Sequence, residues 1–302
     1  MKLQYGKQSE ISDIEGATVD LFLLGGNHEK RVLTFYERVR SKVNIKKSVM
    51  LCFKDETKTE FAEFDCKVVH NCEQIYALLE ECISNNIADS FTILVDYSCM
   101  TKSWYYSIIL FLSNRILDRN DIRVIFSYTP SKFSEPLLPK PNSEIAPLPG
   151  KYVVPTDKPK ALIVCLGYEQ NKAEGIIEHL DPKVCHIFYT KPTLDPLFSE
   201  KVELNNHNIL SESKNQVTTY AFDDLLGLER SLNALYLMLR KDYSIIIAPL
   251  GPKPFALVSM IMAAKYSEID IWRVGSGFDI NEYDRSPLEG DNYVINEIFF
   301  TK

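Results

Sequence analysis

The sequence lacks several patterns by which common classes of protein are recognised. No stretch approaches the roughly 18 consecutive apolar residues of a membrane span, and residues 1–16 have no apolar core of a secretory signal. We therefore expect a protein that neither spans a membrane nor is exported.

The seven cysteines include no C-x-x-C pair, and several lie inside apolar runs. This usage predicts reduced thiols and a cytoplasmic location.

Short motifs for several common chemistries are also missing. The sequence has no G-x-x-x-x-G-K-[ST] phosphate loop, no G-x-G-x-x-G after a predicted strand and no G-x-S-x-G elbow. These absences argue against P-loop NTP hydrolysis, the usual dinucleotide binding and serine hydrolase chemistry. The five histidines form no i, i+4 pair, so we predict no metal site and no cofactor. Residues 26–29 match a fragment of calcineurin-like metallophosphoesterases, whose Asp-x-His and Gly-Asp-x-x-Asp-Arg segments are absent.

Positive charge is in short supply. The formal net charge is −7 and the sequence pI is about 5.4, so the chain as a whole does not attract polyphosphate. This balance argues against duplex DNA as a partner, and any nucleotide must bind through a local basic cluster. The 302 residues, 45% hydrophobic and 25% charged, are enough for two globular cores of about 150 residues.

The sequence does contain one pattern written twice. Residues 147–154 (PLPGKYVV) return 140 residues later in residues 287–295 (PLEGDNYVI), with one extra residue. Near the start of each copy an apolar run ends at glycine, and a glutamate follows shortly after it. These glutamates, Glu29 and Glu169, are also 140 residues apart. Such a period exceeds the roughly 20–50 residues of solenoid repeats and matches a whole domain.

Each half alternates apolar strand patterns with helical ones, which is typical of a parallel sheet covered on both faces. We predict an α/β protein with two tandem Rossmann-like domains, mostly parallel sheets and an internal duplication. In the first half we predict strands at 19–24, 48–53, 91–96 and 122–128, with helices at 28–42, 72–85 and 102–117. In the second half we predict strands at 161–166, 184–189, 244–249 and 269–274, with helices at 171–180, 225–240 and 254–266.

The two halves are joined by a proline-rich segment. Eight of the 15 prolines lie between residues 130 and 159, which predicts an extended connection with a short edge strand at 151–154. The equivalent strand at 293–300 should close the second copy. The predicted domains are therefore residues 1–157 and 158–302.

Candidate ligand residues follow from the rule that open α/β sheets bind ligands beyond the carboxyl ends of their strands. The first predicted loops contain Gly26, His28 and Glu29 in one half and Gly167 and Glu169 in the other. Glycine allows close approach of a ligand, and the N–H groups that open the next helix attract anions. The alternative is a tight strand-to-helix turn with glutamate favourably placed in the first helical turn.

A second loop in each half places a lysine between a buried strand and an apolar helix. These loops contribute Asp96, Ser98 and Lys102 in the first half and Gly251 and Lys253 in the second. Since an ammonium group is costly to bury without a partner, the matched lysines favour an anionic ligand. The alternative is that each lysine is a solvent-exposed charge at the rim of its sheet. Ser276, in a flexible R-V-G-S-G tract, is a further candidate for phosphate binding.

The arrangement resembles the CARF (CRISPR-associated Rossmann fold) domains, which sense cyclic oligoadenylates in prokaryotic antiviral defence. In that family a Gly-Gly-Thr-Lys type loop meets the ligand phosphates. The corresponding residues here are Met100-Thr101-Lys102 and Gly251-Pro252-Lys253, so the lysine corresponds and the rest of the loop departs. No attached nuclease or winged-helix segment is visible, which implies that any effector acts in trans.

We interpret the chain as a cytoplasmic sensor or binding protein for a small nucleotide-like anion, held between two halves related by a pseudo-two-fold axis. One alternative is an enzyme acting on a nucleotide or phosphorylated substrate, with Glu29, His28 or Asp96 as acid or base beside Lys102. Another is a protein-binding subunit of a defence complex. The partners that we expect are therefore the small ligand and an effector protein in trans, with no membrane.

Overall fold

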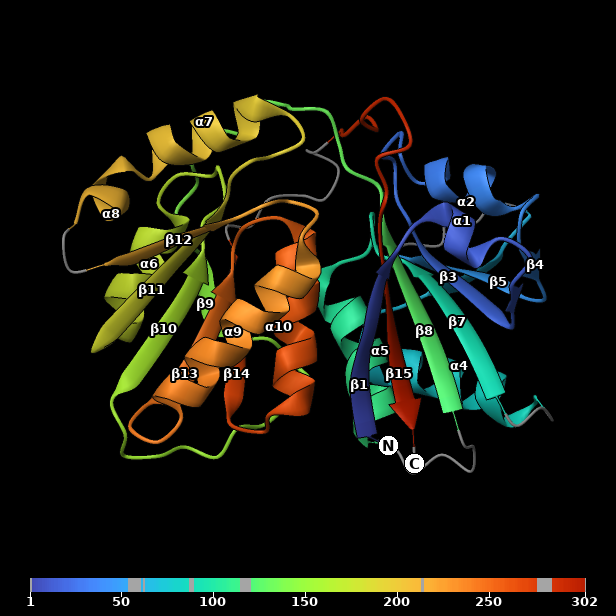
Figure 1. Cartoon of the computed structure of the whole chain (residues 1–302), viewed down its shortest axis with the longest axis horizontal. Coiled ribbons are helices and arrows are strands. Elements are labelled where there is room, and N and C mark those ends of the chain that lie inside the picture. Colours follow the sequence, from blue (N-terminus) through green and yellow to red (C-terminus); the bar gives the residue numbers. More distant parts are fainter. Residues whose placement is uncertain are drawn as a thin grey trace. The chain divides into compact units, whose positions relative to one another are not determined.

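The structure is a computed structural model, and it describes residues 2–53, 61, 63–86, 90–114, 121–212, 215–275 and 284–301. The chain divides into two compact units. Unit 1 comprises Met1–Lys132 together with Asn281–Lys302, and unit 2 comprises Phe133–Ile280. Each unit is an α/β structure built on a mostly parallel sheet (Figure 1). The predicted fold class is therefore confirmed.

Unit 1 contains a seven-stranded sheet in the order β1-β15-β8-β7-β3-β5-β6. Its middle strands are apolar runs with neighbours on both sides, and β3 is buried along its whole length. The strands are β1 (Lys2–Ser9), β3 (Leu21–Gly26), β5 (Ser48–Cys52), β6 (Asp65–Val68), β7 (Ser90–Asp96), β8 (Asp121–Tyr128) and β15 (Val294–Thr301). A separate two-stranded sheet is formed by β2 (Thr18–Val19) and β4 (Asn44–Ile45).

The helices of unit 1 are α1 (Ile11–Ile14), α2 (Thr34–Val39), α4 (Cys72–Ser84) and α5 (Lys102–Asn114). The crossovers from β3 to β5 and from β7 to β8 run in opposite directions along the sheet. Because such crossovers are right-handed, α2 and α5 cover opposite faces. The core on the α2 side includes Phe22, Phe35 and Met50, each fully buried.

Unit 2 contains a six-stranded sheet in the order β12-β11-β10-β13-β14-β9. The strands are β9 (Glu144–Pro147), β10 (Lys160–Cys165), β11 (Val184–Thr190), β12 (Gln216–Tyr220), β13 (Ser244–Pro249) and β14 (Ile269–Gly275). The helices are α6 (Lys172–Leu180), α7 (Pro196–Asn205), α8 (His207–Ser211), α9 (Leu225–Leu239) and α10 (Lys253–Lys265). Leu162, Ile176 and Ile187 belong to a core cluster between the sheet and α6.

Both sheets arrange their five parallel strands in the same way. Numbered along the chain within each unit, the parallel strands lie in the order third, second, first, fourth, fifth. This is the order of the first five strands of the doubly wound dinucleotide-binding fold, whose full order is 3-2-1-4-5-6. Each unit is therefore Rossmann-like. The shared order agrees with an internal duplication, which remains an interpretation of the sequence.

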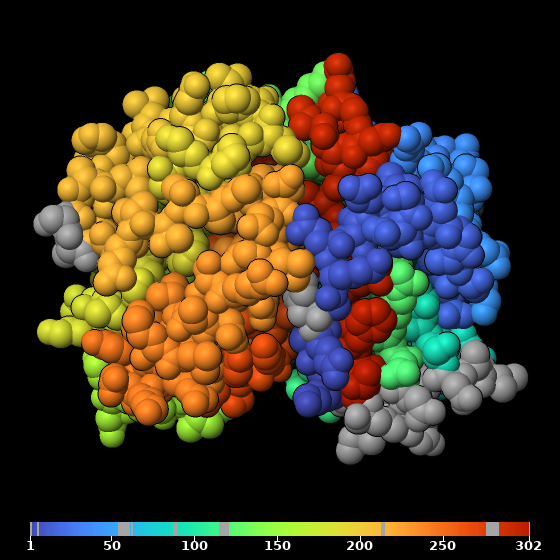
Figure 2. Space-filling model, viewed as in Figure 1, coloured from blue at the N-terminus to red at the C-terminus, as the bar shows by residue number. Residues whose placement is uncertain are grey.

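The closing antiparallel strands are exchanged between the two halves of the sequence. β9 follows the last parallel strand of unit 1 along the chain, yet it pairs with β14 of unit 2. β15 follows β14 along the chain, yet it pairs with β8 and β1 of unit 1. The N-terminal strand β1 and the C-terminal strand β15 consequently pair with each other, and Figure 2 shows the blue and red ends of the chain side by side.

This exchange corrects the predicted domain boundary. We predicted domains at 1–157 and 158–302, whereas residues 133–157 belong to unit 2 and residues 281–302 to unit 1. The strand predicted at 293–300 exists but closes the first sheet, not the second. The edge strand predicted at 151–154 is wrong, because β9 at Glu144–Pro147 already lies beside β14 and leaves Tyr152 80% exposed.

An ion pair joins the fifth parallel strand to the closing strand in each sheet. In unit 1 Arg123 of β8 donates from Nε to Glu297 of β15 at 2.8 Å. In unit 2 Arg273 of β14 donates from one terminal nitrogen to both carboxylate oxygens of Glu144 at 2.8 and 2.7 Å. Each glutamate lies two residues before the register partner of its arginine. The two pairs differ in burial, since Glu297 is 1% exposed and Glu144 is exposed.

Two further expectations from the sequence can be compared with the structure. All seven cysteines lie in described segments and are free thiols. Within the described residues, no helix has both the length and the apolar character needed to cross a membrane.

One buried histidine of unit 2 should make stability depend on pH. His186 of β11 is 5% exposed, and burial lowers its pKa from the ordinary 6.5. As the pH falls below 6.5, the unfolded chain binds a proton that the folded protein resists, so stability is lost on acidification. We expect the wild type to lose up to about 1.4 kcal/mol more than His186→Gln between pH 7.5 and 5.5.

Urea denaturation at the two pH values measures this difference. The other four histidines are exposed in the structure and are common to both proteins, so their contribution cancels. Equal losses in the two proteins would show that His186 titrates as it does in the unfolded chain.

Candidate functional site

The carboxyl ends of the first and fourth parallel strands meet in each unit. In unit 1 a Cβ added at Gly25 would lie 2.8 Å from the carbonyl carbon of Cys99. In unit 2 a Cβ added at Gly167 would lie 2.6 Å from the carbonyl oxygen of Leu250. These distances are too short for a side chain, so glycine is required at both positions for the loops to pack. The two predicted loops of each half are therefore brought together in the fold.

The first loop of unit 1 is not the start of a helix, as we predicted for residues 28–42. The helix α2 begins only at Thr34, and residues 27–33 form turns that bring Arg31 inside. Asn27 accepts a hydrogen bond from the backbone N–H of Glu29 at 2.9 Å and donates from its amide to the Glu29 carboxylate at 3.3 Å. Local side-chain bonds of this kind compete with helix formation, which explains the late start.

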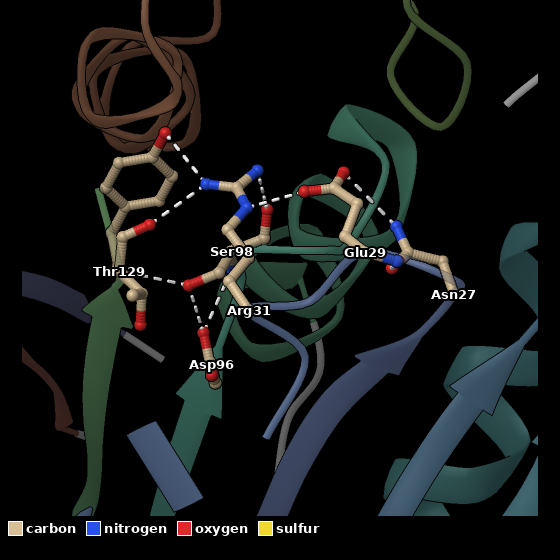
Figure 3. Close-up of polar contacts among 7 residues, drawn as sticks. Asn27, Glu29, Arg31, Asp96, Ser98 and Thr129 are labelled. Carbon is tan, nitrogen blue, oxygen red and sulfur yellow. Dashed lines mark hydrogen bonds and ion pairs between the residues drawn. The ribbon is translucent and has the colours of Figure 1, made fainter. Parts of the chain in front are cut away.

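Arg31 is fully buried and connects three loops (Figure 3). Its Nε donates to Glu29 at 2.6 Å, and its two terminal nitrogens donate to the carbonyl oxygens of Thr129 at 2.9 Å and Ser98 at 3.0 Å. One terminal nitrogen also lies 3.3 Å from the hydroxyl of Tyr128. Burial by itself would lower the pKa of Arg31, but the surrounding Tyr128, Cys99 and Glu29 outweigh it and raise that pKa.

This network changes the interpretation of Glu29. We predicted Glu29 as a ligand residue, but its carboxylate is 8% exposed and binds Arg31 within the protein. Asp96 and Ser98 are similarly buried, at 2% and 1% exposure. One Asp96 carboxylate oxygen accepts from the backbone N–H and the hydroxyl of Ser98, whose Oγ in turn accepts from the backbone N–H of Thr129 at 2.7 Å. These residues join the ends of β3, β7 and β8.

In unit 2 the first loop is held by two asparagines at the end of α7, Asn205 as its last residue and Asn206 as its C-cap. Asn206 is 2% exposed and donates its side-chain amide to the carbonyl oxygen of Gly167 at 2.9 Å. Asn205 donates to the carbonyl oxygen of Tyr168 at 2.5 Å. The Tyr168 ring packs against Phe133 and Phe198, with centroids 6.3 and 5.5 Å away. The sequence carries no signal for the pairing of this asparagine-rich segment with Gly167.

Three helices that begin at the carboxyl edges start with lysine. Lys102 is the first residue of α5, Lys253 of α10 and Lys172 of α6. A cation is unfavourable at the positive end of the helix dipole, and neither α5 nor α10 has an acidic residue in its first turn to offset it. The N–H groups at a helix start are also a favourable place for an anion to bind.

Lys172 was missed in the sequence, where it reads as an ordinary polar residue of a helix. It is 8% exposed, and its Nζ lies 4.0 Å from a carboxylate oxygen of Glu169. Burial lowers the pKa of Lys172, and the neighbouring Glu169 opposes that shift. The predicted residue Glu169 therefore lies close to a basic group, Lys172, at the start of the helix that follows its loop.

The remaining predicted ligand residues differ in exposure and in position. Gly26 ends β3 and is buried, while His28 is exposed. Gly251 lies against the first loop of unit 2, where an added Cβ would be 2.5 Å from Cys165 Sγ. Ser276 lies outside the described residues. Within the described residues, no three His, Cys, Asp or Glu side chains gather closely enough to hold a metal ion.

Comparison with known proteins does not assign the chain to a family. No family model matches the sequence, and no curated protein matches it. Among solved structures, a phosphoethanolamine N-methyltransferase 1 from Haemonchus contortus, in complex with phosphoethanolamine and S-adenosylhomocysteine, aligns with 97% of this chain and 90% of its own. The identity is 9% and the TM-score 0.25, so no functional argument rests on this likeness.

Proposed function

We propose that this protein binds a nucleotide-like anion at the carboxyl edges of its Rossmann-like units, as a sensor in prokaryotic antiviral defence. The observation that carries the proposal is the placement of Lys102 and Lys253. Each is the first residue of the helix that follows the fourth parallel strand of its unit. The resemblance of these loops to CARF domains supports cyclic oligoadenylates as the first ligands to examine.

The chemistry of these loops suits phosphate. The N–H groups at the start of a helix point toward a bound anion, and a lysine beside them supplies a full positive charge. In unit 2 the loop that contains Gly167 lies against the loop that contains Gly251, and Lys172 and Lys253 begin the two following helices. We infer that unit 2 offers the stronger phosphate contact, because the corresponding loop of unit 1 is engaged by Arg31.

A binding experiment with lysine variants tests this proposal. We expect Lys253→Ala to weaken the binding of the anion by about 1.5–3 kcal/mol, the size of a charge-assisted hydrogen bond, which is roughly 10- to 150-fold in Kd. Lys102→Ala should act in the same direction. Thermal shift with mononucleotides, dinucleotides and linear and cyclic oligonucleotides selects the probe, and calorimetry measures its Kd.

The matched control is Lys241→Ala. Lys241 is exposed and lies between α9 and β13, at the opposite end of the same sheet. It should leave the Kd unchanged, which separates local contact from loss of net charge. The absence of any thermal shift with the whole panel would refute the proposal, and conversion of a probe to product would favour the enzyme alternative.

A further inference from the structure

The outer strands of the two large sheets differ in how they are protected from pairing with another chain. An edge strand exposes backbone N–H and C=O groups, and proteins shield such strands with charge, bulges, proline or short length. β6 carries Asp65 and Lys67, an ion pair at 3.1 Å with both side chains partly exposed. β1 carries Lys2 and Lys7 and has a register shift between residues 5 and 7.

The two edge strands of unit 2 are β9 and β12. β9 is four residues long and ends at Pro147, so it too is short and blocked. β12 is five residues long, with no charged residue, no proline and no register shift against β11. It reads Gln216-Val217-Thr218-Thr219-Tyr220, its first four residues are exposed, and Val217 is 42% exposed. Within the described residues β12 lies at the edge of the sheet and pairs with β11 on its inner side.

We propose that the outer edge of β12 is an interaction surface that pairs, antiparallel, with β12 of a second copy of this chain. The two six-stranded sheets would then form one continuous sheet across a two-fold axis. In antiparallel pairing near Thr218, β-branched side chains meet β-branched side chains, which is a favourable cross-strand combination.

The absence of charge along the strand favours a second copy as the occupant. Across a two-fold axis the residues of a strand meet themselves or their near neighbours, so a charged strand opposes its own charge. Residues 215–222 (NQVTTYAF) contain no charged side chain, although the whole chain carries a net charge of −7. Two copies that repel each other overall can therefore meet along this strand, and added salt should strengthen the pairing.

Sedimentation velocity from about 1 to 200 μM tests this inference. We expect the wild type to shift from monomer to dimer as its concentration rises. Thr218→Lys should weaken the dimer at least 10-fold, because two lysines then face each other at the axis. Met238→Lys, at a 58% exposed position on α9, makes the same charge change elsewhere and should leave the dimer intact.

Hydrogen exchange provides a readout that does not depend on the folding of a variant. Backbone amides of residues 216–219 in the wild type should exchange more slowly at high protein concentration than at low concentration. A wild type that stays monomeric throughout, or a Thr218→Lys variant that dimerises as well as the wild type, overturns the proposal. A wild type that stays monomeric and yet binds a synthetic strand peptide of unrelated sequence would reject the second copy and point to strand addition by another protein.

Discussion

Replacing Arg31 with methionine should lower the free energy of unfolding of unit 1 by about 3–5 kcal/mol, the loss expected when one partner of a buried ion pair is removed. The carboxylate of Glu29, at 8% exposure, would lose its cation. The carbonyl oxygens of Ser98 and Thr129 would each lose a donor. Methionine keeps much of the side-chain volume, so the loss reports the charge and hydrogen bonds more than a cavity.

Urea denaturation can follow unit 1 separately, because each unit contains one of the two tryptophans. Trp104 lies in α5 of unit 1 and Trp272 in β14 of unit 2. A Trp272→Phe background therefore leaves a fluorescent reporter in unit 1. This separation matters because two units need not unfold together.

Two further variants control the Arg31 result. Arg40→Met removes an exposed ion pair with Glu37 at 2.7 Å and should cost less than about 1 kcal/mol. The double variant Glu29→Gln, Arg31→Met should recover part of the loss, because no unpaired carboxylate stays buried. If Arg31→Met costs no more than Arg40→Met, the network of Figure 3 does not stabilise the fold.

The closing strand of unit 1 should be nearly as sensitive. Arg123→Ala leaves the carboxylate of Glu297 buried, with the Ser9 hydroxyl at 2.8 Å and Lys7 at 3.9 Å as its remaining partners. We expect a loss of about 3 kcal/mol, at the lower end of the range for breaking a buried pair because those partners remain. The corresponding Arg273→Ala breaks an exposed pair at the same diagonal position of unit 2 and should cost at most about 1 kcal/mol.

The Arg123 effect should also depend on pH. Burial by itself would raise the pKa of Glu297, but hydrogen bonds from Arg123 and Ser9 and the charge of Lys7 outweigh burial and hold that pKa below 4.5. A carboxylate with a lowered folded pKa stabilises the protein above the unfolded pKa and loses this effect as the pH falls. The difference between wild type and Arg123→Ala should therefore shrink below about pH 4.5. A pH-independent difference would mean that lost packing, and not charge, accounts for the cost.

The central strands and long helices could be predicted because their signal is local. The apolar run that became β13 was predicted as residues 244–249 and is found at Ser244–Pro249. Helix α4 was predicted at 72–85 and is found at Cys72–Ser84, with the side chain of Asn71 accepting from the N–H of Gln74 at its start. A continuous apolar run indicates a strand buried on both faces, and apolar residues at helical spacing indicate a helix buried on one face. Both signals lie within the segment itself.

The outer strands could not be predicted in the same way. β6 alternates polar and apolar residues over only four positions, and the first four residues of β12 are all exposed, so neither strand has a long apolar run that marks it in the sequence. β1 is a strand because β15, almost 300 residues away, lies beside it with Lys2 opposite Thr301. Pairing over that distance leaves no mark within a short window of sequence.

The candidate site shows the same division between local and tertiary information. From the sequence it was clear that glycine and lysine follow the first and fourth strands of each half, and the parallel sheet then brings these loops together. The sequence did not reveal that Arg31 turns inward, because an arginine one turn into a predicted helix reads as a surface residue. Its burial depends on the carbonyl oxygens of Ser98 and Thr129, which only the tertiary fold brings within reach.

The sequence by itself therefore determined the α/β class, the Rossmann-like alternation of each half and the edge of each sheet where its loops meet. Hydrophobic periodicity and glycine placement act over a few residues, so they can be read without a structure. Only the tertiary structure decided which closing strand joins which sheet and which charged groups are engaged inside the protein. Strand partners and buried ion pairs depend on residues far apart in the chain, and their energies arise only when the fold removes them from water.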